Sequence, residues 1–270
     1  MEYLVVVDME GIHGVKGENY KTINESFDYH QGVENAIKEI NTIVKALFDN
    51  GATKVGVWDN HGAGTSIDFS KVDSRVIRMD HTKDEFRYDF VKEHNFKRAI
   101  FLGYHSMGGT VNGILAHTYS SKLLQYIKLE GELVGEFTFD SFIMETHGIA
   151  PIFACAGDIC LKEVKGMYPE IQTVCCKYEK GRNDAEFVDS DTVLTEIYNG
   201  VAKAVNSPLP KAVKKFPEVA NVEIRYARPC RAESHYKNGP NGIDFPREYG
   251  DDSHVLKFKI TKPQQIMQLL

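Results

Sequence analysis

The sequence predicts an α/β fold: a mostly parallel central sheet flanked by helices, with a smaller C-terminal α+β lobe. Two observations lead to this expectation. Short apolar runs alternate with amphipathic helical patterns over most of the chain, as they do in parallel sheets covered by helices. A proline-rich segment at 206–210 then separates a shorter region of mixed character. We expect residues 1–205 to form the α/β domain and residues 206–270 to form the smaller lobe, or a further part of the same domain.

The expected elements follow one another in regular alternation. Residues 4–7 form an apolar run typical of a buried strand, and residues 33–47 carry apolar side chains at a spacing of three and four, as one face of a helix does. Further strands are expected at 54–58, 98–102, 152–154, 222–226 and 255–260. Further helices are expected at 83–93, 137–147 and 186–204 and at the C-terminal end. A hairpin with a glycine turn is expected at 126–134, and a loop at 238–252.

Composition and charge exclude several classes of protein. The chain has 270 residues, of which 42% are hydrophobic and 26% are charged, so a folded core is expected. A net charge of −6 argues against a broad nucleic-acid surface, which needs clustered Lys and Arg. No apolar stretch reaches the roughly 18–20 residues that span a bilayer, and the first residues lack the basic segment of a secretory signal. We therefore expect a cytoplasmic protein without membrane or nucleic-acid partners.

The cysteines are consistent with a cytoplasmic protein. The chain has five, an odd number, and no C-x-x-C pair occurs. The sequence therefore predicts free thiols in a reducing compartment, and neither a disulfide framework nor a cysteine zinc site.

Side chains that bind metals follow three of the expected strands at the point where each strand ends. Asp8 and Glu10 follow the first strand, His61 follows the second, and His105 follows the third. The carboxyl ends of parallel strands meet at one edge of a sheet, so these side chains should project into one crevice. Asp8 and Glu10 are two residues apart and would share a face of a regular strand. Carboxylates combined with imidazoles suit zinc better than magnesium or calcium.

Each of these residues also has an ordinary structural explanation. A single histidine at a strand end is more often a hydrogen-bonded structural residue, and a single aspartate there often caps a helix. When three strand ends each carry such a residue, a metal site becomes an equal alternative.

A competing motif begins at the third strand end. The segment His105-Ser106-Met107-Gly108-Gly109 is similar to the G-x-S-x-G elbow of serine α/β-hydrolases. Tyr104 stands where that elbow has its first glycine, and this departure weakens the similarity. A serine hydrolase that uses Ser106 as its nucleophile is therefore an alternative and not the main hypothesis.

Five segments, taken in order, resemble the zinc D-aminopeptidase family of the dipeptide-permease (DppA) type. They are Asp8-Met9-Glu10-Gly11, Asn60-His61, Gly103-Tyr104-His105, His117 and Val134-Gly135-Glu136. The resemblance spans roughly residues 3–185. It implies a pair of zinc ions per subunit, whose ligands fall on Asp8, Glu10, His61, His105 and Glu136, and a further active-site histidine at His117. The residues alone do not choose Glu136 over Glu130 or Glu132; the resemblance does.

The resemblance also implies an activity and an assembly. Members of the family remove the N-terminal residue from short peptides, with D-amino acids such as D-alanine preferred, and they form ring-like homo-oligomers with the sites facing an internal space. We therefore expect a metallo-aminopeptidase that uses metal-activated water on short peptides or amino-acid amides. His13 stands where the family usually has Ser or Thr, and Asn60 stands where it has Ser. These two differences put the substrate preference in doubt.

Two further alternatives use the same ligands. A two-metal phosphoesterase would need more Arg or Lys near the strand ends to hold phosphate. A non-catalytic, metal-dependent binding protein would need the ligands but not His117.

Overall fold

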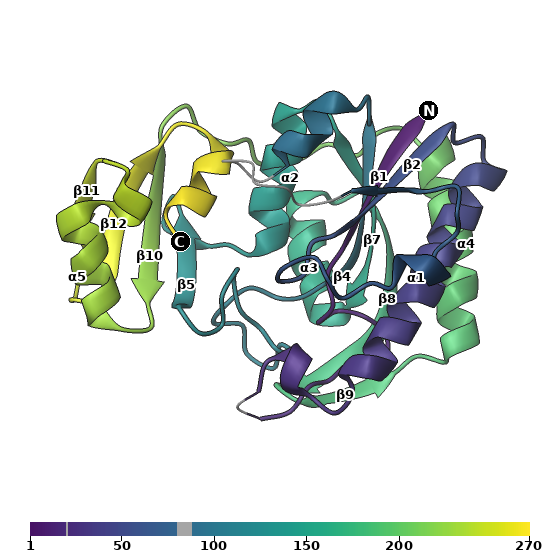
Figure 1. Ribbon diagram of the computed structural model, residues 1–270, viewed down its shortest axis with the longest axis horizontal. Coiled ribbons are helices and arrows are strands. Elements are labelled where there is room, and N and C mark those ends of the chain that lie inside the picture. Colours follow the sequence, from purple (N-terminus) through teal and green to yellow (C-terminus); the bar gives the residue numbers. More distant parts are fainter. Residues whose placement is uncertain (20, 80–87) are drawn as a thin grey trace.

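The computed structural model describes residues 1–19, 21–79 and 88–270, and its larger sheet has seven strands in the order β3-β2-β1-β4-β7-β8-β9 (Figure 1). All neighbouring strands are parallel except β9, which is antiparallel to β8. The strands are β1 (Glu2–Val7), β2 (Lys54–Asp59), β3 (Ile77–Met79), β4 (Arg98–Tyr104), β7 (Ala150–Gly157), β8 (Gln172–Gly181) and β9 (Asp184–Phe187). The expected mostly parallel sheet is confirmed.

Helices cover both faces of this sheet, as Figure 1 shows. One face packs against α1 (Tyr29–Asp49) and α4 (Ser190–Asn206), and the other against α2 (Glu136–Thr146) and α3 (Asp158–Met167). Alternate residues of β1 belong to different cores: Val5 contributes to the α1–α4 side and Val6 to the α2–α3 side. A strand buried on both faces explains why this segment is uniformly apolar instead of alternating.

A second, antiparallel sheet has the strand order β11-β12-β10-β5-β6. Its strands are β5 (Leu124–Leu129), β6 (Glu132–Leu133), β10 (Ala220–Tyr226), β11 (Arg247–Tyr249) and β12 (Val255–Ile260), and α5 (Pro229–Asn238) packs beside it. The expected hairpin at 126–134 therefore pairs with C-terminal strands, through β5 and β10. Both expected regions contribute to this sheet, so the division at residue 205 stays a prediction.

The short helices differ most from expectation. Of the helix expected at 83–93, residues 83–87 lie outside the described residues, and the remainder is a 3₁₀ turn, η3 (Asp89–Glu93), which follows Tyr88 in a left-handed conformation. That left-handed residue prevents a continuous α-helix from entering the turn. The expected loop at 238–252 contains β11 and a 3₁₀ turn, η4 (Pro240–Gly242), and the expected C-terminal helix is the 3₁₀ turn η5 (Pro263–Gln268). Two further 3₁₀ turns are η1 (Ile23–Glu25) and η2 (Phe69–Lys71).

Two negative expectations can be compared with the structure. Among the described residues, no helix is long and apolar enough to cross a bilayer. All five cysteines are free thiols.

Candidate metal centre

The candidate centre lies at the point in the sheet where the strand order reverses. The chain adds β2 and β3 on one side of β1 and then crosses to place β4 on the other side. At such a point the connections after neighbouring strands diverge and leave a crevice at their carboxyl ends. Asp8 directly follows β1, His105 directly follows β4, and His61 lies two residues beyond β2. The three strand ends are thus brought together as expected.

The backbone at Asp8 differs from the expectation in one respect. β1 ends at Val7, so Asp8 and Glu10 lie in a turn and do not share the face of a strand. Gly11 makes the turn possible, because its N–H donates to the Gly103 carbonyl at 2.7 Å and a Cβ there would meet the Tyr104 carbonyl oxygen at 1.9 Å. This close approach of two backbones requires glycine. This turn, and not the shared face of a strand that was predicted, brings the Asp8 and Glu10 carboxylates to the crevice.

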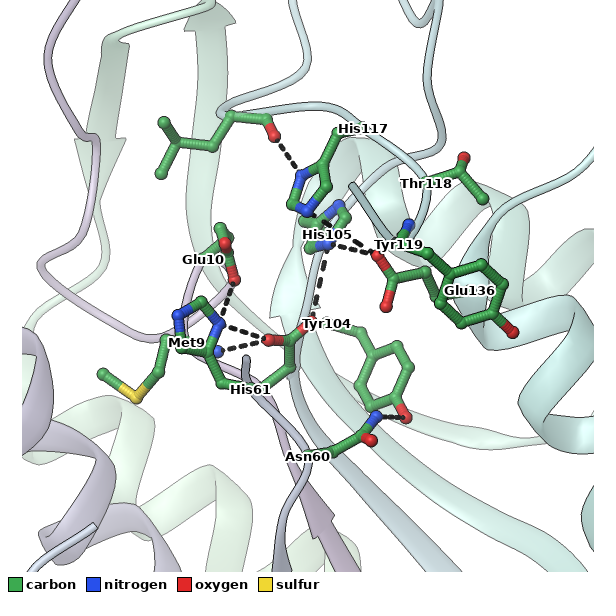
Figure 2. Close-up of polar contacts among 12 residues, drawn as sticks. Met9, Glu10, Asn60, His61, Tyr104, His105, His117, Thr118, Tyr119 and Glu136 are labelled. Carbon is green, nitrogen blue, oxygen red and sulfur yellow. Dashed lines mark hydrogen bonds and ion pairs between the residues drawn. The ribbon is translucent and has the colours of Figure 1, made fainter. Parts of the chain in front are cut away.

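Five of the predicted residues form two groups that share Asp8. His61 Nδ1 lies 3.1 Å from Asp8 Oδ1 and 3.2 Å from Glu10 Oε2. On the other side, His105 Nε2 lies 3.5 Å from Asp8 Oδ2 and 3.2 Å from Glu136 Oε1. Within each group the possible ligand atoms all lie within 4.8 Å of one another. Figure 2 shows Glu10 and His61 on one side of the centre and Glu136 on the other.

His117 completes the centre from a separate loop. Its ring stacks on that of His105, with 4.0 Å between ring centroids and 10° between ring planes (Figure 2). Its Nε2 lies 3.7 Å from Glu136 Oε1. Glu10, His105 and His117 form a third group of possible ligands within 4.8 Å. His117 therefore reaches the centre, as expected, and is close enough to contact an ion or a substrate held there.

The hydrogen bonds of the three histidines fix their tautomers. His61 Nε2 lies 2.7 Å from Asn24 Oδ1, His105 Nδ1 lies 3.0 Å from the Ser106 carbonyl, and His117 Nδ1 lies 2.8 Å from the Leu115 carbonyl. Each of these oxygens is an acceptor, so each ring nitrogen beside it must donate a proton. The second nitrogen of every ring faces the carboxylates, and in its deprotonated form it can bind an ion placed between them. Metal-binding histidines in proteins have this arrangement.

The charges of the centre are strongly perturbed. Burial, together with the neighbouring Glu10 carboxylate, raises the pKa of Asp8 to about 7. Burial opposes protonation of His61, but Glu10 and Asp8 outweigh it and raise the pKa of His61 to about 12. His105 is affected in the same way through Glu136, and its pKa is raised to about 10. Protons on these rings balance the buried carboxylates, which is the role that a cation would take.

His117 has the opposite electrostatics. Burial and the charge of the neighbouring His105 lower the pKa of His117, so its ring is neutral at pH 7. A neutral ring with a free Nε2 lone pair can accept a proton.

Two buried ligand atoms support a cation at this position. Glu10 Oε2 and His105 Nε2 are buried and make no hydrogen bond of acceptable geometry. Buried polar atoms in folded proteins nearly always have a partner, so atoms of this kind indicate a site for an ion or a ligand. The donor set of carboxylate oxygens and imidazole nitrogens fits zinc.

Several residues that support the centre could not be identified from the sequence pattern. Asn24, which binds His61, lies in η1 and is 37 residues away in the chain. Lys177 is fully buried and donates to the carbonyls of Glu10 at 2.7 Å, Ile12 at 3.2 Å and Val15 at 2.6 Å. Its ammonium thus holds the turn that carries both N-terminal carboxylates. The only local sign of this role is a lysine at the end of the apolar run Val174-Cys175-Cys176.

Asp140 connects the segments around the centre. It is fully buried on α2, one turn after Glu136, and its Oδ2 accepts from Tyr104 Oη at 2.6 Å and Asn60 Nδ2 at 3.2 Å. Its Oδ1 accepts from Tyr119 Oη at 3.2 Å. Tyr104 and Asn60 are the residues before His105 and His61, so one carboxylate orients the backbone that precedes two of the histidines.

Two other residues singled out in the sequence do not line the cavity that contains Asp8 and Glu10. The Ser106 side chain is fully buried, and a Cβ on Gly113 would lie 2.1 Å from its Oγ. An irregular loop, not a helix, follows it, so the geometry does not favour the serine-hydrolase alternative. His13 Nε2 lies 2.7 Å from the Val188 carbonyl, and its ring packs against Phe187.

Comparisons with known proteins cover most of the chain. A sequence model of a protein family described as D-aminopeptidase matches residues 1–237. A D-aminopeptidase of Bacillus subtilis (strain 168) is 22% identical over 183 residues, which are 68% of this chain and 66% of that protein, just under two thirds of its length.

The chain also matches a solved structure, described as the Zn-dependent D-aminopeptidase DppA from Bacillus subtilis, a self-compartmentalizing protease. The TM-score is 0.85 at 19% identity, and the match covers 100% of this chain and 95% of that chain. At this identity the structural likeness shows a shared fold.

Proposed function

The chain belongs to the D-aminopeptidase family, and we propose that it is a zinc-dependent aminopeptidase that removes the N-terminal residue, D-alanine among the possible ones, from short peptides or amino-acid amides. One observation carries the proposal: three histidines each donate one ring proton to an oxygen and direct the other nitrogen toward Asp8, Glu10 or Glu136. The zinc dependence stated for the related Bacillus structure supports the choice of metal.

We further propose two zinc ions per chain, held by Asp8, Glu10, His61, His105 and Glu136. Two three-residue groups support this number, and Asp8 belongs to both. Its Oδ1 faces His61 and its Oδ2 faces His105, which supports Asp8 as a ligand that both groups would share. A bridging carboxylate of this kind is common in two-metal sites.

The residues of the chain would have separate roles in the hydrolysis. Asp8, Glu10, His61, His105 and Glu136 would hold the zinc, which would lower the pKa of a bound water to about 7 and polarise the carbonyl of the scissile amide. His117, neutral and with its Nε2 lone pair toward the centre, would take a proton from the attacking water and return it to the leaving amine. Asp8, Glu10 and Glu136 would supply the negative charge that balances the bound ions.

The metal content of the active protein tests the proposal. We expect about two zinc ions per chain, loss of peptide hydrolysis after chelation and recovery when zinc is restored. The measurement combines elemental analysis with an assay of dipeptides, amino-acid amides and a phosphate monoester, each with and without zinc.

Ser106→Ala serves as a control and should keep its activity, because that side chain is fully buried and does not line the cavity beside the centre. Active protein without a transition metal would contradict the proposal. Hydrolysis of the phosphate ester alone would favour the phosphoesterase. Bound zinc without any hydrolysis would favour the binding protein.

We also propose that the chain assembles into a homo-oligomer larger than a dimer. The support is that the related Bacillus structure is described as a self-compartmentalizing protease, which requires several subunits around a closed space. Light scattering at micromolar concentration should report a mass several times that of the 30.5 kDa chain. A monomer under these conditions would remove this part of the proposal.

A further inference from the structure

The cavity beside the metal centre contains one basic side chain that is not ion-paired. Asp8, Glu10 and Glu136 line this cavity of about 500 Å³, and so do Lys21, Lys122 and Arg182. The two lysines already have acidic partners, since Lys21 Nζ lies 2.9 Å from Glu18 and Lys122 Nζ lies 3.7 Å from Glu25. Within residues 1–19, 21–79 and 88–270, the Arg182 guanidinium makes no ion pair and no hydrogen bond.

The backbone of Arg182 is held firmly beside His117. Arg182 lies in the turn between β8 and β9, and its carbonyl accepts from the Leu115 N–H at 3.3 Å. The Leu115 carbonyl in turn accepts from His117 Nδ1 at 2.8 Å. On the other side, Asn183 Nδ2 donates to the Lys16 carbonyl at 3.1 Å. The turn is therefore fixed on both sides, and only two hydrogen bonds separate its backbone from the ring of His117.

The Arg182 side chain is exposed to solvent and lines the cavity, so its guanidinium is accessible to a ligand that enters there. A guanidinium carries five N–H donors in a planar arrangement that matches the two oxygens of a carboxylate. The cavity thus contains a cluster of carboxylates at the metal centre and an unsatisfied binding group for an anion at Arg182. Its volume lies within the range of about 300–1,000 Å³ that is usual for small-ligand sites.

A short peptide has a group that could bind at each end of this cavity. Its N-terminal amine, in the neutral form, could bind a metal ion held at the centre, and its C-terminal carboxylate carries a negative charge at the far end. We infer that Arg182 binds the free C-terminal carboxylate of the substrate, and that the substrates are therefore free di- or tripeptides and not blocked peptides or the N-termini of folded proteins. This inference rests on the proposed aminopeptidase function and specifies the class of substrate for the same site.

The test compares a dipeptide with its own C-terminal amide, in one chirality at a time. The wild-type protein should prefer the free acid by about 10–100-fold in kcat/KM, the usual effect of a charge-assisted hydrogen-bonded pair. Arg182→Met should lose this preference, mainly through a higher KM for the acid, with the rate on the amide nearly unchanged. Arg182→Lys should keep part of it, because a lysine restores the charge but not the planar pair of hydrogen bonds.

Lys180→Met is the matched control. Lys180 precedes the same turn and carries the same charge, but it is paired with Glu186 at 2.6 Å and does not line the cavity. This variant should keep the wild-type preference for the free acid. A loss of preference in Lys180→Met would show that general charge, and not the Arg182 side chain, sets the selectivity.

Two results would overturn the inference. One is a wild-type protein that hydrolyses acid and amide equally well. The other is an Arg182→Met protein whose kcat falls equally on both substrates, because Arg182 would then act on the reacting carbonyl or on the position of His117.

A binding measurement separates this inference from the proposed function. A dipeptide whose amide bond is reduced to an amine, and its C-terminal amide, are titrated into the zinc-loaded protein by calorimetry. Tighter binding of the acid in wild type, lost in Arg182→Met, supports the inference even if no substrate is hydrolysed. Hydrolysis of the amide without any difference in binding supports the proposed function and contradicts the inference.

Discussion

Replacing Asp8 with alanine is expected to lower the zinc content from about two ions per chain to less than about one, and to reduce hydrolysis to the level of the chelated protein. Asp8 has this large effect because its two oxygens face different groups: Oδ1 lies 3.1 Å from His61 Nδ1, and Oδ2 lies 3.5 Å from His105 Nε2. Elemental analysis of the purified variant and the amide assay measure both effects.

His61→Ala is the comparison for this prediction. His61 belongs to only one of the two groups that share Asp8, so its removal should release one ion and leave the group of Asp8, His105 and Glu136 in place. If Asp8→Ala keeps as much zinc as His61→Ala, Asp8 does not bridge the two ions. Thermal unfolding of both metal-free variants against the metal-free wild type controls for a general loss of structure.

Replacing His117 with alanine is expected to lower turnover by a factor of about 10²–10⁴, the usual contribution of one acid–base group. Its zinc content and its oligomeric state should stay as in the wild type. The reason is that the two ring nitrogens have separate roles. Nδ1 donates to the Leu115 carbonyl at 2.8 Å, and Nε2 of the neutral ring is left as a proton acceptor at the centre.

His105→Ala is the matched variant, because its ring stacks on that of His117 at 4.0 Å but its Nε2 lies between Asp8 and Glu136. This variant should lose zinc as well as turnover. Loss of zinc in His117→Ala would show that His117 is a ligand, through its group with Glu10 and His105. Near-normal turnover in His117→Ala would show that it does not transfer protons.

The sequence predicted the parts of the centre that depend on local order along the chain. Asp8, His61 and His105 each follow an apolar run, and the parallel arrangement of β1, β2 and β4 then brings them to one edge of the sheet. The face-sharing argument for Asp8 and Glu10 was wrong, because it assumed that β1 continues beyond Val7. The contact that ends the strand is the close approach of Gly11 to Gly103, which is 92 residues away in the chain and leaves no local pattern.

Other features depended on contacts that no local pattern records. No local sequence pattern distinguishes Glu136 as a ligand from Glu130 and Glu132. Glu136 lies beside His105 only because α2 begins at that residue. The β5–β6 hairpin was expected, but its pairing with β10 depends on a strand that begins 91 residues after β5 ends. Asn24, Asp140 and Lys177 act through tertiary contacts, and single residues of these types are common in many other roles.

The contacts of Lys177 have a consequence for how the protein binds its ion. An ammonium has three N–H donors, and here all three are used on the carbonyls of Glu10, Ile12 and Val15. The protein itself therefore holds the backbone of this turn, without any contribution from an ion. Fixing one residue costs about 1–2 kcal/mol of conformational entropy, and in this protein that loss occurs during folding instead of during metal uptake. Metal binding then needs little rearrangement of the turn, so the order that Lys177 gives this backbone, together with the ligands themselves, favours tight retention of the ion.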